Sequence, residues 1–197
     1  MQASKVDSRV LIEGLISGLN AQPARLKDNW CVPPEQGELM TLLARIHQSR
    51  QILEVGTSIG YSGLCFLQAL LDTDGHLTTL DASAERQTIA KEHFDKVGCT
   101  DRVTLLNGEA IPLLETLIQD RPHSFNMMFL DAKKSEYIDY WRLSSSLLVP
   151  GGVLLADNTS SHRLAMKIFI DSIRQDKRWQ VVEIPTAHGL MLGRLKP

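Results

Sequence analysis

Short apolar runs alternate with helical patterns over most of this chain. Buried strands are predicted at residues 52–55, 76–80, 102–106, 125–130 and 153–156. Apolar residues at helical spacing predict helices at 64–71, 84–97, 110–119, 135–147 and 162–174. Such alternation is typical of β-α-β units and a parallel sheet. Two closing strands, 179–184 and 190–195, are joined by a short link and should pair antiparallel.

The N-terminal part precedes this alternation. Its apolar spacing predicts an amphipathic helix over residues 5–19, and residues 20–33 are predicted to be irregular because prolines interrupt them. A second helix is expected from Pro34. Its buried stripe should be Leu39, Leu42, Leu43 and Ile46. We therefore expect a single domain over residues 1–197, with residues 1–33 as a helical cap or lid segment.

A glycine-rich turn follows the first predicted strand, in the segment Gln51–Gly63. Gly56, Gly60 and Gly63 leave N–H groups unpaired at a helix N-terminus and allow close approach of a ligand, which suits a nucleoside cofactor. The spacing matches neither the dinucleotide fingerprint nor a P-loop. The Glu54 carboxylate would repel phosphate but attract a cation such as the amino group of S-adenosylmethionine. The turn favours that cofactor, although α/β proteins also place glycines between strand and helix without any ligand.

Acidic residues stand at the ends of several predicted strands. They are Glu54, Asp81, Asp131 and Asp157, the last followed by Asn158. In an open parallel sheet, ligands bind outside the carboxyl ends of the strands. Each carboxylate alone is better explained as a solvated loop residue or a helix cap than as part of a site. Together on one edge they would repel one another unless a positive group lies between them.

These positions predict two kinds of site. Asp81, one strand beyond the glycine turn, is placed to accept hydrogen bonds from both ribose hydroxyls. Asp131, Asp157 and Asn158 offer only oxygen ligands, which suit Mg²⁺, Mn²⁺ or Ca²⁺ rather than zinc. Near such a cation the charged form of Lys134 is disfavoured, which suits a general base.

Composition limits the classes of partner. The chain has 197 residues, is 43% hydrophobic and 22% charged, and carries a formal net charge of −2. This balance gives no general case for nucleic acid or an anionic membrane as partner. Three separated cysteines indicate a reducing compartment, so a cytoplasmic location is expected. A run of about 18 apolar residues, as a membrane-spanning helix needs, is absent from the sequence.

Several motifs together resemble one family. LEVGTSIGYS, LDAS, NGEA, FLDAKKSEYIDY and LLVPGGVLLADNT are similar to the pattern of the cation-dependent O-methyltransferases, which include catechol and caffeoyl-coenzyme A O-methyltransferases. The similarity runs from about Pro34 to Thr159. It implies a Rossmann-like, doubly wound sheet of seven strands, mostly parallel with an antiparallel last strand, and helices on both faces. It also implies S-adenosylmethionine, Mg²⁺, methylation of one of two vicinal hydroxyls on a small molecule, and a homodimer.

The resemblance also implies roles for individual residues. The cofactor residues would be Val32 and Ser62 at the methionine carboxylate, Glu54 and Gly56 along the methionine and sugar end, Asp81 at the ribose, and Glu109 and Ala110 at the adenine, with Asp131 beside them. The metal ligands would be Asp131, Asp157 and Asn158. Lys134 would be the catalytic base, assisted by Asp131.

The chain departs from the family pattern around the acceptor. Trp30 stands where methionine is usual, His188-Gly189 replaces an aspartate-glycine pair, and the segment after Asn158 runs directly toward a helix. The acceptor pocket should therefore be short-walled. Either the acceptor is large and covers the site itself, or another subunit or the N-terminal segment supplies the wall. We expect a broad or bulky acceptor, with the segment Val6–Trp30 as a movable lid.

Two other functions fit the same residues. Some bacterial relatives methylate a hydroxylated uridine in tRNA, and a basic rim would favour such an acceptor, although the net charge argues weakly against it. That rim would comprise Arg163, Lys167, Arg174, Lys177 and Arg178. A non-catalytic nucleoside-binding protein is the other alternative, but it would not need the metal set or Lys134.

Overall fold

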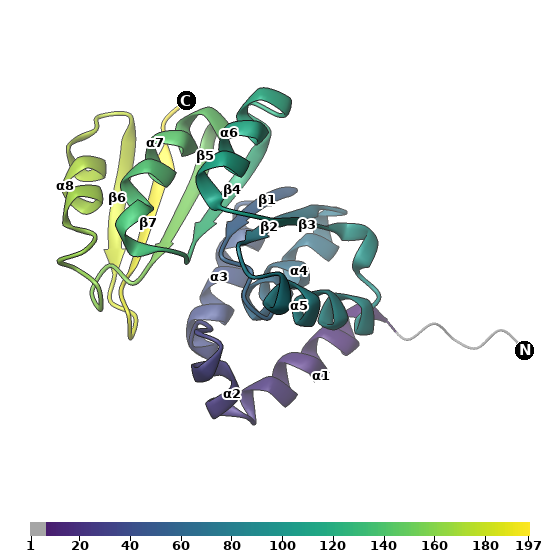
Figure 1. Ribbon diagram of the computed structural model, residues 1–197. Coiled ribbons are helices and arrows are strands. Elements are labelled where there is room, and N and C mark those ends of the chain that lie inside the picture. Colours follow the sequence, from purple (N-terminus) through teal and green to yellow (C-terminus); the bar gives the residue numbers. More distant parts are fainter. Residues whose placement is uncertain (1–6) are drawn as a thin grey trace, which may run out of the picture.

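The structure, a computed structural model, describes residues 7–197 and is built around one seven-stranded sheet (Figure 1). The strands are β1 (Gln51–Val55), β2 (His76–Asp81), β3 (Val103–Asn107), β4 (Phe125–Leu130), β5 (Leu148–Asp157), β6 (Trp179–Ile184) and β7 (Leu190–Leu195). Their order is β3-β2-β1-β4-β5-β7-β6. Neighbours pair in parallel from β3 to β5, whereas β7 is antiparallel to both β5 and β6. The predicted mostly parallel sheet with an antiparallel last strand is confirmed.

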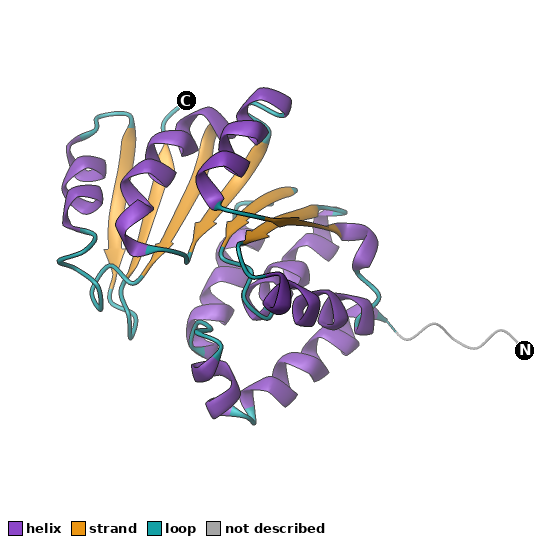
Figure 2. Ribbon diagram, viewed as in Figure 1, coloured by secondary structure: helices purple, strands orange, loops and turns teal. Residues whose placement is uncertain are grey.

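Helices cover both faces of the sheet (Figure 2). The α-helices are α1 (Ser8–Asn20), α2 (Pro23–Asp28), α3 (Pro34–Ile46), α4 (Tyr61–Thr73), α5 (Ala84–Lys96), α6 (Ala110–Asp120), α7 (Tyr137–Leu147) and α8 (Lys167–Gln175). Two short 3-10 turns, η1 (Thr100–Arg102) and η2 (Lys134–Glu136), precede β3 and α7. Helices α6, α7 and α8 lie over one face and α3, α4 and α5 over the other, with α1 packed on α4 (Figure 1). Within the described residues, none of these helices is long and apolar enough to span a membrane.

Strand β1 shows why the central strands are apolar throughout. Leu53 and Val55 belong to the core beneath α6, α7 and α8, whereas Ile52 belongs to the core beneath α3, α4 and α5. Successive side chains of a strand point to opposite faces, so a strand covered by helices on both faces needs apolar residues at every position. The charged Glu54 breaks this rule in the middle of the sheet. Such an exception marks β1 as the strand to follow toward a site.

The chain reverses its direction across the sheet between β1 and β4. It moves outward from β1 to β3, returns to the other side of β1 at β4, and continues to β5. A reversal of this kind opens a crevice at the carboxyl ends of the two strands, where ligands of doubly wound proteins bind. Val55 ends β1 and Leu130 ends β4, so the residues that follow them border this crevice.

The N-terminal segment differs from the prediction in one element. The expected first helix is present as α1, capped by the Asp7 side chain, while residues 5 and 6 of the predicted range lie outside the described residues. Residues 20–33 are not irregular throughout, because α2 occupies Pro23–Asp28. Pro23 stands in the first helical turn, where its missing N–H has no partner to lose, so treating it as a breaker was wrong.

The buried face of α3 is also different from the predicted stripe. Leu42 and Ile46 are 54% and 71% exposed, and Leu39 and Leu43 are only partly buried. The buried residues include Gly37 and Thr41. Thr41 donates to the carbonyl of Cys65 at 2.9 Å, and a Cβ at Gly37 would lie 2.8 Å from the Cys65 sulfur. Helix α3 therefore turns its small residues toward α4, since only they allow so close an approach.

The last helix begins later than predicted. Helix α8 starts at Lys167, and residues 159–166 form turns instead. The N–H groups of Ser160 and Ser161 both donate to the His188 carbonyl, at 2.9 and 3.0 Å, and that of Thr159 donates to Gly189 at 3.1 Å. These bonds attach the segment after β5 to the segment before β7.

Candidate active site

The turn between β1 and α4 brings two strand ends together. Gly56 has φ +108°, and a Cβ there would lie 2.1 Å from the carbonyl oxygen of Asp131. The Asp131 N–H in turn donates to the Val55 carbonyl at 2.9 Å. Gly60 has φ +82°, and a Cβ there would lie 2.9 Å from the Phe94 ring. These glycines thus have packing roles of their own. Gly56 allows the residue after β4 to approach closely, and Gly60 allows α5 to do so.

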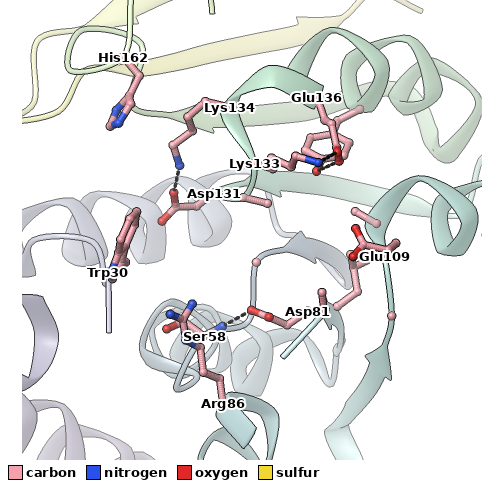
Figure 3. Close-up of a pocket in the computed structure, with 17 residues that line it drawn as sticks. Trp30, Ser58, Asp81, Arg86, Glu109, Asp131, Lys133, Lys134, Glu136 and His162 are labelled. Atoms are coloured by element: carbon pink, nitrogen blue, oxygen red, sulfur yellow. Dashed lines mark hydrogen bonds and ion pairs between the residues drawn. The ribbon is translucent and has the colours of Figure 1, made fainter. Parts of the chain in front are cut away.

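A cavity of about 460 Å³ opens at this edge of the sheet (Figure 3). Five of the predicted cofactor residues line it: Gly56, Asp81, Glu109, Ala110 and Asp131. They come from the ends of β1, β2 and β4 and from the start of α6. The volume is in the usual range for a small-molecule site, roughly 300–1,000 Å³. The crevice predicted from topology is therefore a real hollow.

Asp81 is held rigidly at the end of β2. One carboxylate oxygen accepts the Ser58 N–H at 2.8 Å, and the other accepts the Ser83 N–H at 2.8 Å. Ser83 itself caps α5 by accepting the Arg86 N–H, so the cap of that helix does not need Asp81. The remaining acceptor capacity of the carboxylate is available to a ligand, because each oxygen accepts more than one hydrogen bond.

The other predicted cofactor residues lie behind this cavity. Val32, Glu54 and Ser62 are buried and do not line it. Thr79 donates to one oxygen of Glu54 at 2.5 Å, and the other oxygen has no hydrogen-bond partner within the described residues. Burial raises the pKa of Glu54 to about 7, although the nearby hydroxyls of Ser62 and Thr79 favour the charged form. The folded protein thus disfavours the charged form of this carboxylate.

Glu54→Gln should make the unfolding free energy less dependent on pH. The folded protein binds this proton more tightly than the unfolded chain does. The free energy of unfolding that Glu54 contributes is therefore full below the ordinary glutamate pKa of 4.5, and it declines as pH rises from there to about 7. The loss amounts to about 3 kcal/mol by linkage. Urea unfolding of both proteins across this range is the measurement. A constant difference between them would contradict the buried-acid assignment.

A second hollow, of about 230 Å³, adjoins the first. It contains all of the predicted metal ligands, Asp131, Asp157 and Asn158, together with Lys134. Trp30, Asp131, Lys134 and His162 line both hollows. In Figure 3 the pair of Lys134 and Asp131 stands between Trp30 and His162 on one side and Asp81 and Glu109 on the other. The two hollows therefore meet at that pair. The larger, which is lined by predicted cofactor residues, is called the cofactor cavity below, and the smaller, which is lined by the predicted metal ligands, is called the acceptor-side cavity.

The acceptor-side cavity contains side-chain oxygen atoms whose charge or hydrogen-bonding capacity is only partly satisfied by the chain. The Lys134 side-chain nitrogen lies 2.9 Å from a carboxylate oxygen of Asp131. Burial, and next the charge of Asp131, raises the pKa of the Asp157 carboxyl to about 6. The side-chain oxygen of Asn158 is buried and has no hydrogen-bond partner within the described residues. Buried polar atoms are nearly always paired, so this set is suited to a group that the chain itself does not supply.

Some residues of these cavities had no predicted role. Arg86, Glu136 and Tyr140 line the first cavity, and Lys27 lines the second. Trp30, His162 and His188 were identified only as departures from the family pattern. Arg86 was detectable in principle, because it lies in the first turn of a helix that starts at the site edge of the sheet. The others depend on contacts between segments far apart in sequence.

The fold is that of the Rossmann-like methyltransferases. An O-methyltransferase from Bacillus cereus, solved in complex with SAH, has a TM-score of 0.82 and 25% identity, covering 100% of this chain and 94% of that chain. A family model described as O-methyltransferase matches residues 10–196. The chain therefore belongs to the O-methyltransferase family, as its motifs indicated.

Curated relatives agree with this membership. A catechol O-methyltransferase from Niastella koreensis is 36% identical over 127 residues, which cover 64% of this chain and 57% of that protein. A caffeoyl-CoA O-methyltransferase from Populus kitakamiensis is 32% identical over 148 residues, which cover 75% of this chain and 63% of that protein. The chain thus spans less than two thirds of the length of these relatives.

Proposed function

We propose that this chain transfers a methyl group from S-adenosylmethionine to one of two adjacent hydroxyls of a catechol-like small molecule, assisted by a divalent cation. The observation that carries the proposal is the meeting of two cavities at Asp131 and Lys134. One cavity offers a ribose-binding acid and the other offers oxygen ligands and a base. Donor and acceptor would then meet where the two cavities join.

The cofactor would occupy the larger cavity. Asp81 would accept hydrogen bonds from the ribose hydroxyls, and Glu109 and Ala110 would contact the adenine. Gly56 and Asp131 would border the sulfonium end. Val32, Ser62 and Glu54 lie deeper, and they would hold the methionine carboxylate and amino group. A cationic amino group would supply the charge that the half-paired Glu54 carboxylate lacks.

The residues of the smaller cavity fit a hard divalent cation. Asp131, Asp157 and Asn158 present carboxylate and amide oxygens, the ligands that Mg²⁺, Mn²⁺ and Ca²⁺ prefer. The unpaired Asn158 oxygen and the destabilised charge of Asp157 are both relieved by a cation. Among residues 7–197, His, Cys, Asp and Glu form no group of three that could hold a metal. The proposed set consists of two carboxylates and one amide, so water or acceptor oxygens would complete the coordination shell. A bound cation of this kind makes a neighbouring hydroxyl more acidic.

The remaining chemistry belongs to the chain. Lys134, as a neutral amine, would take the hydroxyl proton, while Asp131 fixes its position through their 2.9 Å contact. The oxygen–methyl bond forms as the sulfur–methyl bond breaks, and S-adenosylhomocysteine leaves. The walls of both cavities hold the two reactants in line, which accounts for much of the acceleration in reactions of this type.

Asp81→Ala should weaken cofactor binding. Loss of a charged hydrogen-bond acceptor costs about 1.5–3 kcal/mol, or roughly 10- to 150-fold in affinity. S-adenosylhomocysteine should raise the melting temperature of the parent chain by mass action, and NAD should not. The shift should shrink in the variant when measured against the melting temperature of its own ligand-free form. Stabilisation by NAD, or an unchanged shift, would contradict the assignment.

A panel of acceptors tests the whole function. Vicinal diols and hydroxylated nucleosides are incubated with S-adenosylmethionine, with and without Mg²⁺, and methylated products are measured. Transfer to catechols only with Mg²⁺ is expected. Transfer to a hydroxylated uridine would favour the tRNA alternative, and binding without turnover would favour the non-catalytic one. We also expect a homodimer, which sedimentation tests.

A further inference from the structure

The wall of the acceptor-side cavity carries basic side chains that the transfer itself does not use. Lys27, His162 and His188 line it in addition to Lys134. Lys134 is paired with Asp131, and His188 lies close enough to influence the Asp157 carboxyl. Lys27 and His162 form no ion pair within the described residues. The cavity thus has acids at the proposed metal set and, away from that set, the basic side chains of Lys27 and His162.

The loop that carries His162 has a fixed backbone. Three N–H groups of residues 159–161 donate to carbonyls of His188 and Gly189, as described above. The His162 N–H donates to the Asn158 carbonyl at 2.9 Å. Gly189 has φ +78°, and a Cβ there would lie 2.3 Å from the Ser160 hydroxyl, so the two segments are as close as backbones allow. His162 is therefore held in place by main-chain bonds.

Side-chain contacts also orient the imidazole ring of His162. The Asn158 side-chain amide donates to the Ser161 hydroxyl at 3.3 Å. That hydroxyl lies 3.1 Å from Nδ1 of His162. The other ring nitrogen, Nε2, forms no hydrogen bond within the described residues, and it is left for a ligand.

Trp30 adds an aromatic surface at a backbone position that disfavours a bulky side chain. Helix α2 ends with the Trp30 N–H donating to Lys27 and the Cys31 N–H donating to Leu26, at 3.1 and 2.9 Å. This cap places Trp30 at a left-handed position, φ 56°, where glycine is usual. The ring is nevertheless 73% exposed and lines both cavities. A bulky residue in a strained, exposed position points to a ligand rather than to packing.

The size and charge of the surroundings favour a small acceptor, in contrast to the bulky one expected from the sequence. The cavity, about 230 Å³, is smaller than the range for drug-sized ligands. Beyond it, Arg163 and Arg174 are both paired with Glu183, and Lys167 is paired with Asp171. The basic rim that would follow a nucleic-acid backbone is thus largely neutralised. Lys27 has no ion pair within the described residues, and Nε2 of His162 has no hydrogen-bond partner there. These two groups on one cavity wall can serve the two oxygens of one carboxylate.

We propose that the acceptor is an ortho-dihydroxylated aromatic acid, with its carboxylate bound by Lys27 and His162 and its ring lying against Trp30. This inference rests on the proposed function and specifies its substrate class. The residues act in recognition, so their loss should affect the choice of acceptor more than the rate of transfer at saturation.

The test compares an acid with a neutral analogue of similar shape, 3,4-dihydroxybenzoate and 4-methylcatechol, on the full chain with S-adenosylmethionine and Mg²⁺. The acid should have a kcat/KM at least about tenfold higher, since hydrogen bonds to charged groups are worth that much. Lys27→Ala and His162→Ala should each lower this preference about five- to tenfold, mainly through KM. Arg25→Ala removes a charge from the same helix without touching the cavity, and it should leave the preference intact.

Calorimetry with the protein saturated in S-adenosylhomocysteine gives a second readout. The acid should bind more tightly than the neutral analogue, and the two variants should remove the difference. Trp30→Gly should weaken both ligands while the melting temperature stays equal or rises, because glycine suits the cap. Equal binding and equal turnover of the two acceptors would overturn the inference, as would weaker binding of S-adenosylhomocysteine by Lys27→Ala, because Lys27 lines only the smaller cavity. If neither acceptor is methylated, the proposed function fails, and the binding difference alone decides this inference.

Discussion

Changing Asp157 to asparagine is expected to lower methyl transfer more than about 100-fold, because even changes to groups that only support a metal ligand cost 10- to 100-fold. The asparagine oxygen can still accept the Asn158 N–H, now 2.7 Å from the carboxylate, so the local backbone should keep its shape. Asp157 does not line the cofactor cavity. Affinity for S-adenosylhomocysteine should therefore remain close to that of the parent chain, as measured by calorimetry.

The same variant should gain stability while it loses activity. Burial and the charge of Asp131 raise the pKa of Asp157 to about 6, so its stability contribution is full at low pH and declines as pH rises through that value. Asparagine removes the decline, and urea unfolding at about pH 8 without added metal should give a higher free energy for the variant. Full activity of the variant, or of the parent chain in excess EDTA, would show that this oxygen set has another purpose.

The sheet and the position of the site were predictable for physical reasons. Central strands must be apolar on both faces, so β1 and β4 stand out as short apolar runs in which Glu54 and Asn126 are the polar exceptions after the first position. Parallel strands bring their carboxyl ends to one edge, so residues that follow them, such as Asp81 and Asp131, gather without any sequence signal linking them. Strand periodicity and topology act over the whole chain, and both can be recognised in a single sequence.

The acceptor wall was not predictable in the same way. His162 and His188 face one cavity because N–H groups of residues 159–161 bond to carbonyls of residues 188–189. Backbone bonds between distant segments leave no periodic pattern. Leu42 was assigned to the core because it is apolar, yet close contact between α3 and α4 selected Gly37 and Thr41 for that face. Apolar character alone does not identify the face of a short amphipathic helix when small residues permit closer packing.

Replacing Lys134 by arginine is expected to lower kcat about 10²- to 10⁴-fold, the usual contribution of a general base. Arginine keeps the positive charge and can keep the pairing with Asp131, but its guanidinium cannot lose a proton in a protein. Lys134→Met should be equally inactive, since it lacks the base as well. A purely structural role for the ion pair predicts a different order, with arginine active and methionine impaired.

Lys133 provides the matched control for this prediction. Its side chain is 67% exposed and paired with Glu136, whereas that of Lys134 is 18% exposed and paired with Asp131. Lys133→Met should therefore retain kcat. Without the base, the bound acceptor hydroxyl must lose its proton to water before transfer. The kcat of both Lys134 variants should therefore rise about tenfold per pH unit until that hydroxyl is ionised. A flat pH profile in Lys134→Arg, or an equal loss in Lys133→Met, would assign the proton to another group.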